Sequence, residues 1–141
     1  MIDTKTAPYA ALVLRVALGV MFLAHGLWLK VFVFTLPGTA MFFESLGLPA
    51  PLAYVVFAAE TVGGILLILG VKTRLVALAL VPILLGATWT HAGNGWVFTA
   101  EGGGWEYPLF LSVTAAVQAL LGDGAYALKV PGLRSAAQTA A

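Results

Sequence analysis

Cysteine is absent from this chain, and charged side chains are scarce. None of the 141 residues is a cysteine, which excludes disulfides, thiolate metal sites and a thiol relay carried by the chain itself. Charged residues make up 9 %, against roughly a quarter in a soluble domain. The net charge is +1 and there is no basic block, so nucleic acid is excluded as a partner. Because the chain has no thiol, any redox chemistry must use a bound cofactor or a partner.

What fills the sequence instead is apolar. Hydrophobic residues make up 61 % and the mean hydropathy is +0.99, values that exclude an ordinary soluble domain. A membrane span needs about 20 mostly apolar residues, and four windows qualify. We therefore predict an all-α fold, a polytopic integral membrane four-helix bundle in one domain over residues 1–130, followed by a disordered cytoplasmic tail over 131–141. The predicted spans are 8–30, 52–70, 75–92 and 107–122.

The first window is interpreted as a retained helix and not as a signal peptide. Asp3 offsets Lys5 and Arg15 interrupts the apolar run, whereas a signal peptide has a basic start and a short uncharged core. Between the first two windows, Pro37-Gly38 and Gly47-Leu48-Pro49 leave room only for a short helix. We predict this helix over Thr39–Leu46, lying at the membrane interface.

The distribution of cations predicts the orientation. Lys and Arg residues that flank membrane spans favour the cytoplasmic side. One side of the predicted bundle has five such cations and the other has only Lys30, so we predict that both termini are cytoplasmic. The five are Lys5, Lys72, Arg74, Lys129 and Arg134. The opposite rim is expected to carry an interfacial belt of aromatic residues: Trp28, Tyr54, Trp89, Trp96, Trp105 and Tyr107.

Charged groups inside the apolar windows are the candidate site residues. An ionised side chain near the bilayer centre costs about 2.5–3.5 kcal/mol of insertion free energy, so such residues are rare and commonly have a function. Arg15 lies about two turns inside the first span, and Glu60 lies about two turns inside the second span, counted from the opposite face of the membrane. We predict that they pair in the bundle interior. Such a pair either carries chemistry or only fixes the register of two helices.

His25 and His91 lie at a depth similar to that of Glu60, and Glu106 begins the last window on the same side. Together they predict a polar cluster in an apolar cavity, of the kind that orients a ligand. The alternatives are a His25 hydrogen-bonded within the bundle, an interfacial His91 and an exposed Glu106 at a helix start.

A quinone suits this cluster best, because its ring needs an apolar slot and its carbonyls need donors such as His or Arg. One histidine per helix, without His-x-x-x-His or Glu-x-x-His spacing, disfavours haem and gives no metal site. Glycines at Gly19, Gly26 and Gly63-Gly64 predict close helix packing. Gly102-Gly103-Gly104 lacks the features of a nucleotide loop and is interpreted as a flexible outer turn.

An ordered set of short motifs resembles the DoxX family over about residues 12–121. The set comprises Leu14-Arg15 with Gly19, Phe22, His25-Gly26, Lys30, Phe43-Glu44-Ser45-Leu46-Gly47-Leu48-Pro49, Glu60 with Gly63-Gly64, Leu69-Gly70 and Thr73-Arg74-Leu75. The resemblance implies a four-helix protein of the bacterial cytoplasmic (inner) membrane, in some relatives linked to redox complexes. Related DoxD proteins are associated with thiosulfate oxidation coupled to quinone reduction. Arg15, Lys30, Glu60 and Arg74 match the family pattern.

Two functions remain open at this point. In the first, the chain is a quinone-linked redox subunit whose catalytic residues are Glu60, handling the proton, and Arg15. Its ligand-binding residues are then His25, His91, Lys30 and Trp28. In the second, it is a non-catalytic accessory subunit or assembly factor of a larger membrane complex. A small transporter is less favoured, because the sequence shows no inverted repeat or broken helix.

Overall fold

A computed structural model describes residues 3–129, and over this range the fold is entirely helical. Helix α1 (Ala7–Leu23) continues without a break into the π-helical segment η1 (Ala24–Val33). The other helices are α2 (Leu36–Ser45), α3 (Ala50–Leu69), α4 (Thr73–His91) with a single 3₁₀ turn η2 (Ala92–Asn94), and α5 (Glu106–Leu121). The tail expected over 131–141 lies outside the described residues.

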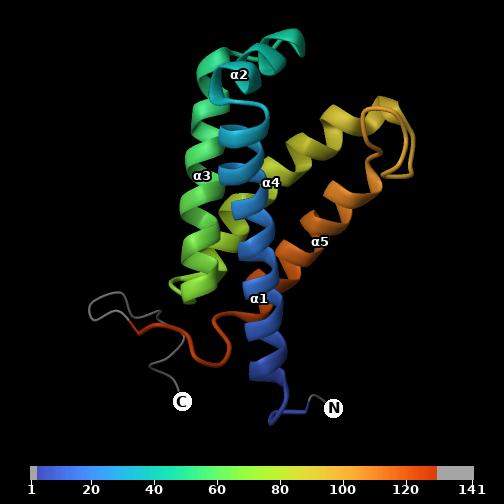
Figure 1. Ribbon diagram of the computed structural model, residues 1–141. Helices are drawn as coiled ribbons and strands as arrows, with labels where there is room; N and C mark the ends of the chain where they lie inside the picture. Colours follow the sequence, from blue (N-terminus) through green and yellow to red (C-terminus); the bar gives the residue numbers. More distant parts are fainter. Residues whose placement is uncertain (1–2, 130–141) are drawn as a thin grey trace.

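The helices form two pairs that meet at one end (Figure 1). α1 lies along α3, and α4 lies along α5. The pairs converge near the start of α4 and diverge toward the loop that joins α4 to α5, while α2 lies across the far end of α3. We call the convergent part the closed end and the divergent part the open end. The buried apolar core lies where the pairs meet, and it consists of Leu18, Phe22, Leu67, Ala77, Leu80, Leu84 and Ala115.

Within residues 3–129, three helical segments are long and apolar enough to cross a membrane: Ala7–Val33, Ala50–Leu69 and Thr73–Asn94. The fourth predicted span is also a helix, but α5 has 16 residues and a length of roughly 24 Å at 1.5 Å per residue, which is less than the hydrocarbon thickness of about 30 Å. Large apolar side chains such as Val13, Leu78 and Phe110 are more than half exposed, as expected for a surface that contacts lipid.

α2 begins three residues before the predicted helix of 39–46. The Oγ1 of Thr35 accepts from Gly38 N at 3.2 Å and its carbonyl accepts from Thr39 N at 2.9 Å, so Thr35 caps the helix start. Pro37 therefore lies in the first turn, where the missing N–H is harmless. The sequence interpretation was wrong in taking Pro37-Gly38 as a break before the helix.

The predicted close packing of glycines is confirmed between α1 and α3. A Cβ added to Gly19 would lie 2.7 Å from the carbonyl oxygen of Gly64, and one added to Gly64 would lie 2.9 Å from the carbonyl oxygen of Gly19. Real Cβ atoms do not approach backbone this closely, so the two helices are in backbone contact. Small residues at such a crossing are typical of membrane helices.

The closed end is organised by Arg15, which is only 1 % exposed. Its guanidinium donates to the carbonyl oxygens of Leu67, Asp123 and Ala125, each at 2.9 Å, and to that of Ile68. The carbonyls of Leu67 and Ile68 belong to the last turn of α3, where carbonyls lack the regular i+4 amide partner; that of Leu67 also accepts from Gly70 N at 3.1 Å. Arg15 therefore caps α3 and holds the chain that follows α5.

That following chain, residues 122–128, forms a clasp across the closed end. The Oδ1 of Asp123 accepts from Thr73 N at 3.0 Å, which satisfies a free amide at the start of α4. The amide of Ala125 donates to the carbonyl of Pro8 at 2.8 Å. The 122–128 clasp thus touches the first turns of α1 and α4 and, through Arg15, the end of α3.

The predicted Arg15–Glu60 pair is wrong. Glu60 and Leu67, whose carbonyl Arg15 caps, are seven residues apart on α3, or about 10 Å along the axis. Arg15 finds its acceptors among backbone carbonyls at the closed end, and Glu60 pairs instead with Lys30. Gly70 makes this arrangement fit: it has φ +72° and an added Cβ would lie 2.9 Å from Cζ of Arg15.

Candidate functional site

The ion pair of the open end joins Lys30 of η1 to Glu60 of α3. Lys30 Nζ lies 2.5 Å from Glu60 Oε2, and the two side chains are 15 % and 9 % exposed. The ammonium also donates to the carbonyl of His25 at 3.4 Å. A carboxylate buried this deeply in an apolar helix bundle needs such a partner.

The π-helical geometry of η1 brings Lys30 to this position. Hydrogen bonds in a π-helix join residues five apart, as in the bond from Phe34 N to Leu29 O at 2.8 Å. His25 and Lys30 are five residues apart, so the ammonium of Lys30 lies over the carbonyl of His25. In a regular α-helix, residues that stack are three or four apart, and the two would face different directions.

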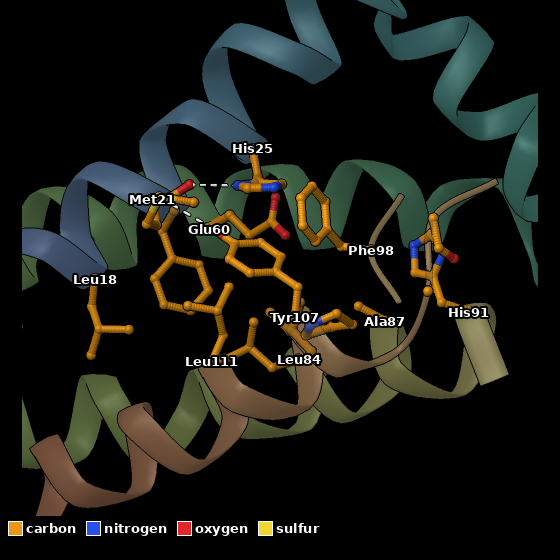
Figure 2. A pocket seen from close by; sticks show the side chains of 15 residues that line it. Leu18, Met21, His25, Glu60, Leu84, Ala87, His91, Phe98, Tyr107 and Leu111 are labelled. Carbon is orange, nitrogen blue, oxygen red and sulfur yellow. Dashed lines mark hydrogen bonds between the residues drawn. The ribbon is translucent and has the colours of Figure 1, made fainter. Parts of the chain in front are cut away.

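A cavity of about 520 Å³ opens between the two helix pairs beside Glu60 (Figure 2). Most of its wall is apolar, and its polar side chains are those of His25, Glu60, His91 and Tyr107. Volume and lining are in the range of small-molecule sites, which bury a ligand among apolar walls with a few orienting polar groups. The structure therefore brings His25, His91 and Glu60 to one cavity. The other lining residues are Leu18, Met21, Phe22, Ile83, Leu84, Ala87, Phe98, Gly103, Gly104, Pro108 and Leu111.

A second cavity of about 480 Å³ lies on the other side of these polar residues, beneath α2. Its wall includes Lys30, Phe42 and Phe43, and five residues line both spaces. The two cavities thus meet at the ion pair and the histidines. The shared residues are His25, Glu60, Ile83, Ala87 and His91.

Each histidine ring is held by backbone oxygen. His25 Nδ1 lies 2.8 Å from the carbonyl oxygen of Met21, one turn earlier. His91 Nδ1 lies 3.0 Å from the oxygen of Gly102 and 3.1 Å from that of Gly103. These glycines have φ +77° and +78°, a conformation that glycine adopts readily, and it is in this turn that their carbonyls meet the ring.

Tyr107 joins this site from the start of α5. Its ring centre lies 6.1 Å from that of His25, and its hydroxyl donates to the sulfur of Met21 at 3.4 Å, a weak acceptor. The sequence interpretation placed Tyr107 only in the aromatic belt, and Phe98, whose ring points into the cavity in Figure 2, was not predicted at all. No pattern in the sequence indicates that the α4–α5 loop folds back over the site.

Two other candidates lie elsewhere. Trp28 is 61 % exposed and stacks on Phe32 with ring centres 5.5 Å apart, and it lines neither cavity, because its position on η1 faces outward. Glu106 accepts from Phe98 N at 2.8 Å and so fastens the loop at the first turn of α5. Over residues 3–129, no three His, Asp or Glu side chains are grouped as metal ligands.

The sequence profile of the DoxX family matches residues 10–93. The chain belongs to the DoxX family. Among curated proteins it is similar to "Putative oxidoreductase CatD" of Bacillus subtilis (strain 168), with 41 % identity over 83 residues. The alignment covers 59 % of this chain and 60 % of that relative, so the match spans little more than half of either protein. No solved structure matches the chain significantly.

The DoxX match covers nearly all of α1 to α4 and includes the buried or cavity-lining polar residues of these helices: Arg15, His25, Lys30, Glu60 and His91. Tyr107 and the 122–128 clasp lie beyond it. The chain is thus a DoxX membrane protein with a relative described as an oxidoreductase.

Proposed function

We propose that this protein is a quinone-linked redox subunit that binds its ligand in the cavity beside Glu60. The observation that carries the proposal is the convergence of Glu60, His25, His91 and Tyr107 on one apolar cavity of about 520 Å³. Apolar walls suit a quinone ring, the Tyr107 hydroxyl can donate to a ring oxygen, and imidazole and carboxylate groups can accept from the hydroxyls of the reduced ring. The relative's description as an oxidoreductase is in accord with this proposal.

The residues of the chain fit the proposed ligand in separate roles. A bound quinone would supply reversible two-electron redox chemistry coupled to proton transfer. Tyr107 has a hydroxyl that can leave the sulfur of Met21, a poor acceptor, for a ring oxygen. Glu60 can take or give a proton at the cavity wall, while Lys30 compensates its charge when the proton is absent. Arg15 has no part in this site, since its donors are used at the closed end.

The proposal includes a position in the membrane. We place the protein in the bacterial cytoplasmic membrane with four spans, α5 being the shortest, and with α2 at the outer interface. The excess of Lys and Arg at the closed end then faces the cytoplasm with both termini. The cavity opens toward the other leaflet, where a lipid-soluble ligand can enter between the helix pairs.

The first experiment is mass spectrometry of an organic extract of the mildly purified protein. We expect a quinone at about one per chain in the wild type. The Glu60→Gln variant should lose most of it, because the amide can neither hold the proton nor pair fully with Lys30. Glu44→Gln is the matched control, since Glu44 is exposed on α2 and lines neither cavity.

Extracted lipid without quinone, together with a failure of added short-chain quinone to bind, would contradict the proposal. The accessory-subunit function would then be favoured. Equal retention of quinone by Glu60→Gln and Glu44→Gln would place the ligand elsewhere on the protein. Thermal unfolding in the same detergent shows whether each variant is folded.

A further inference from the structure

The two histidines of the chain share one hydrogen-bonding pattern that defines what the cavity can recognise. His25 Nδ1 and His91 Nδ1 both contact backbone carbonyl oxygens. A carbonyl only accepts, and the two carbonyls near His91 Nδ1 are closer than its one donor contact, Asn94 Nδ2 at 3.5 Å, so Nδ1 carries the hydrogen in both rings. In a neutral imidazole the other nitrogen then has a lone pair and no hydrogen. Nε2 of each ring is therefore an acceptor.

The surroundings fix this tautomer. Asn94 Nδ2 donates to the same carbonyls of Gly102 and Gly103, at 3.0 Å each, so these oxygens are gathered between the amide and the ring of His91. His25 is tied to Met21 within its own helix at 2.8 Å. Moving the proton of either ring from Nδ1 to Nε2 would place a lone pair against carbonyl oxygen, which is costly in an apolar site.

Acceptors consequently outnumber donors among the polar side chains of the first cavity. With Glu60 ionised in its pair with Lys30, His25, His91 and Glu60 offer lone pairs, and the hydroxyl of Tyr107 is the one side-chain donor among these four residues. The ammonium of Lys30 donates to Glu60 and to the carbonyl of His25 and lines only the second cavity. A ligand that satisfies this wall must bring its own O–H groups.

We propose that the cavity recognises the hydroxyl-bearing form of an aromatic ring ligand, a quinol or phenol, with Nε2 of His25 and His91 as acceptors. This inference rests on the proposed function for the site and adds which redox form is bound more tightly. The carbonyl form would oppose its lone pairs to those of the two imidazoles. A site that hydrogen-bonds a hydroxyl discriminates strongly against an analogue without it.

The test compares 4-butylphenol with its methyl ether, 4-butylanisole, which keeps the ring, the butyl chain and the oxygen but has no O–H; neither probe is a quinone. Their affinities for the purified protein in lipid nanodiscs are measured by calorimetric titration. We expect the phenol to bind at least about tenfold more tightly than its methyl ether. His25→Asn and His91→Asn should each reduce this ratio about threefold or more, because the Asn amide can replace Nδ1–H but leaves no Nε2. Trp28→Phe, outside both cavities, is the matched control and should keep the ratio.

The outcomes separate this inference from the proposed function. Equal affinity of phenol and ether in the wild type would overturn the hydroxyl preference while leaving a ring-binding cavity, and this result needs no variant to fold. A tenfold preference that both Asn variants retain would also overturn the assignment to Nε2. Binding of neither probe, with no binding of a short-chain quinone, would overturn both proposals.

Discussion

The two ends of this bundle each bury a cation, and they satisfy it in different ways. At the closed end, Arg15 donates only to backbone carbonyls, which have no proton to exchange. At the open end, Lys30 pairs with the carboxylate of Glu60, which lines two cavities and can be protonated. The first arrangement fixes three helices and the 122–128 clasp. The second leaves an ionisable group beside a space that fits a ligand.

The comparison shows why charge inside a membrane segment is not by itself a sign of chemistry. Such residues are by default candidates for function, and both Arg15 and Glu60 met that criterion in the sequence. The structure separates them by their partners: Arg15 contacts backbone carbonyls at a helix end, and Glu60 contacts the ammonium of Lys30 beside two cavities.

The largest effect is expected from breaking the closed end. Arg15→Met removes all four donated bonds, so the carbonyls of Ile68, Asp123 and Ala125 lose their side-chain donor while that of Leu67 keeps only Gly70 N. We expect the free energy of unfolding to fall by about 3 kcal/mol, measured by reversible unfolding in mixed micelles. Arg74→Met is the control, because Arg74 is exposed and makes one bond of 3.3 Å to Ala119. Equal losses in the two variants would contradict the assigned role of the clasp.

The next effect concerns the contact that joins the two ends along α1 and α3. Gly19→Ala places a Cβ 2.7 Å from the carbonyl oxygen of Gly64, so the helices must separate. Overpacking of this kind costs about 2 kcal/mol, visible as a lower midpoint of thermal unfolding. Gly86→Ala in α4 meets nothing within 4 Å and should be neutral or slightly stabilising through helix propensity. A neutral Gly19→Ala would refute the backbone contact.

The smallest effect is expected at the open end, and a double-mutant cycle measures it. Lys30→Met and Glu60→Gln, singly and together, should give a coupling energy of about 1 kcal/mol in the free energy of unfolding, because each side chain retains some exposure. Lys72→Met combined with Glu60→Gln should be additive, since Lys72 precedes α4 at the closed end. Coupling as large as the Arg15 effect would make the ion pair a structural element and weaken the contrast between the ends.

Hydropathy and the positions of glycine and proline predicted the helices well, because both signals depend on local sequence. The windows 52–70 and 75–92 nearly coincide with α3 and α4, and Gly70 ends α3 with the left-handed φ of +72° that glycine allows. Small residues inside an apolar window likewise predict close helix packing from local sequence alone, and Gly19 and Gly64 lie at the α1–α3 contact.

The hydrogen-bond and ion-pair partners of the buried charges could not be predicted from local sequence. Sequence shows Arg15 but not the four carbonyls that attract it, because every residue has a carbonyl. The π-helical stretch of η1 has no distinctive composition, so no sequence pattern predicts that Lys30 lies over His25 and beside Glu60. Tyr107 and Phe98 enter the site only because the α4–α5 loop folds back, which depends on contacts such as Phe98 N to Glu106.

The 122–128 clasp also has a consequence for biogenesis. Arg15 and its acceptor Asp123 are separated by 108 positions, which a ribosome takes roughly 5–20 s to translate. By the end of that interval α1, α3 and α4 have been synthesised. The carbonyls of Asp123 and Ala125, which Arg15 contacts in the folded protein, are the last of its four acceptors to be made. The guanidinium must meanwhile remain hydrated or be sheltered by the insertion machinery. The closed end therefore reaches its full set of contacts only after residues 123–125 have been synthesised, later than α1, α3 and α4.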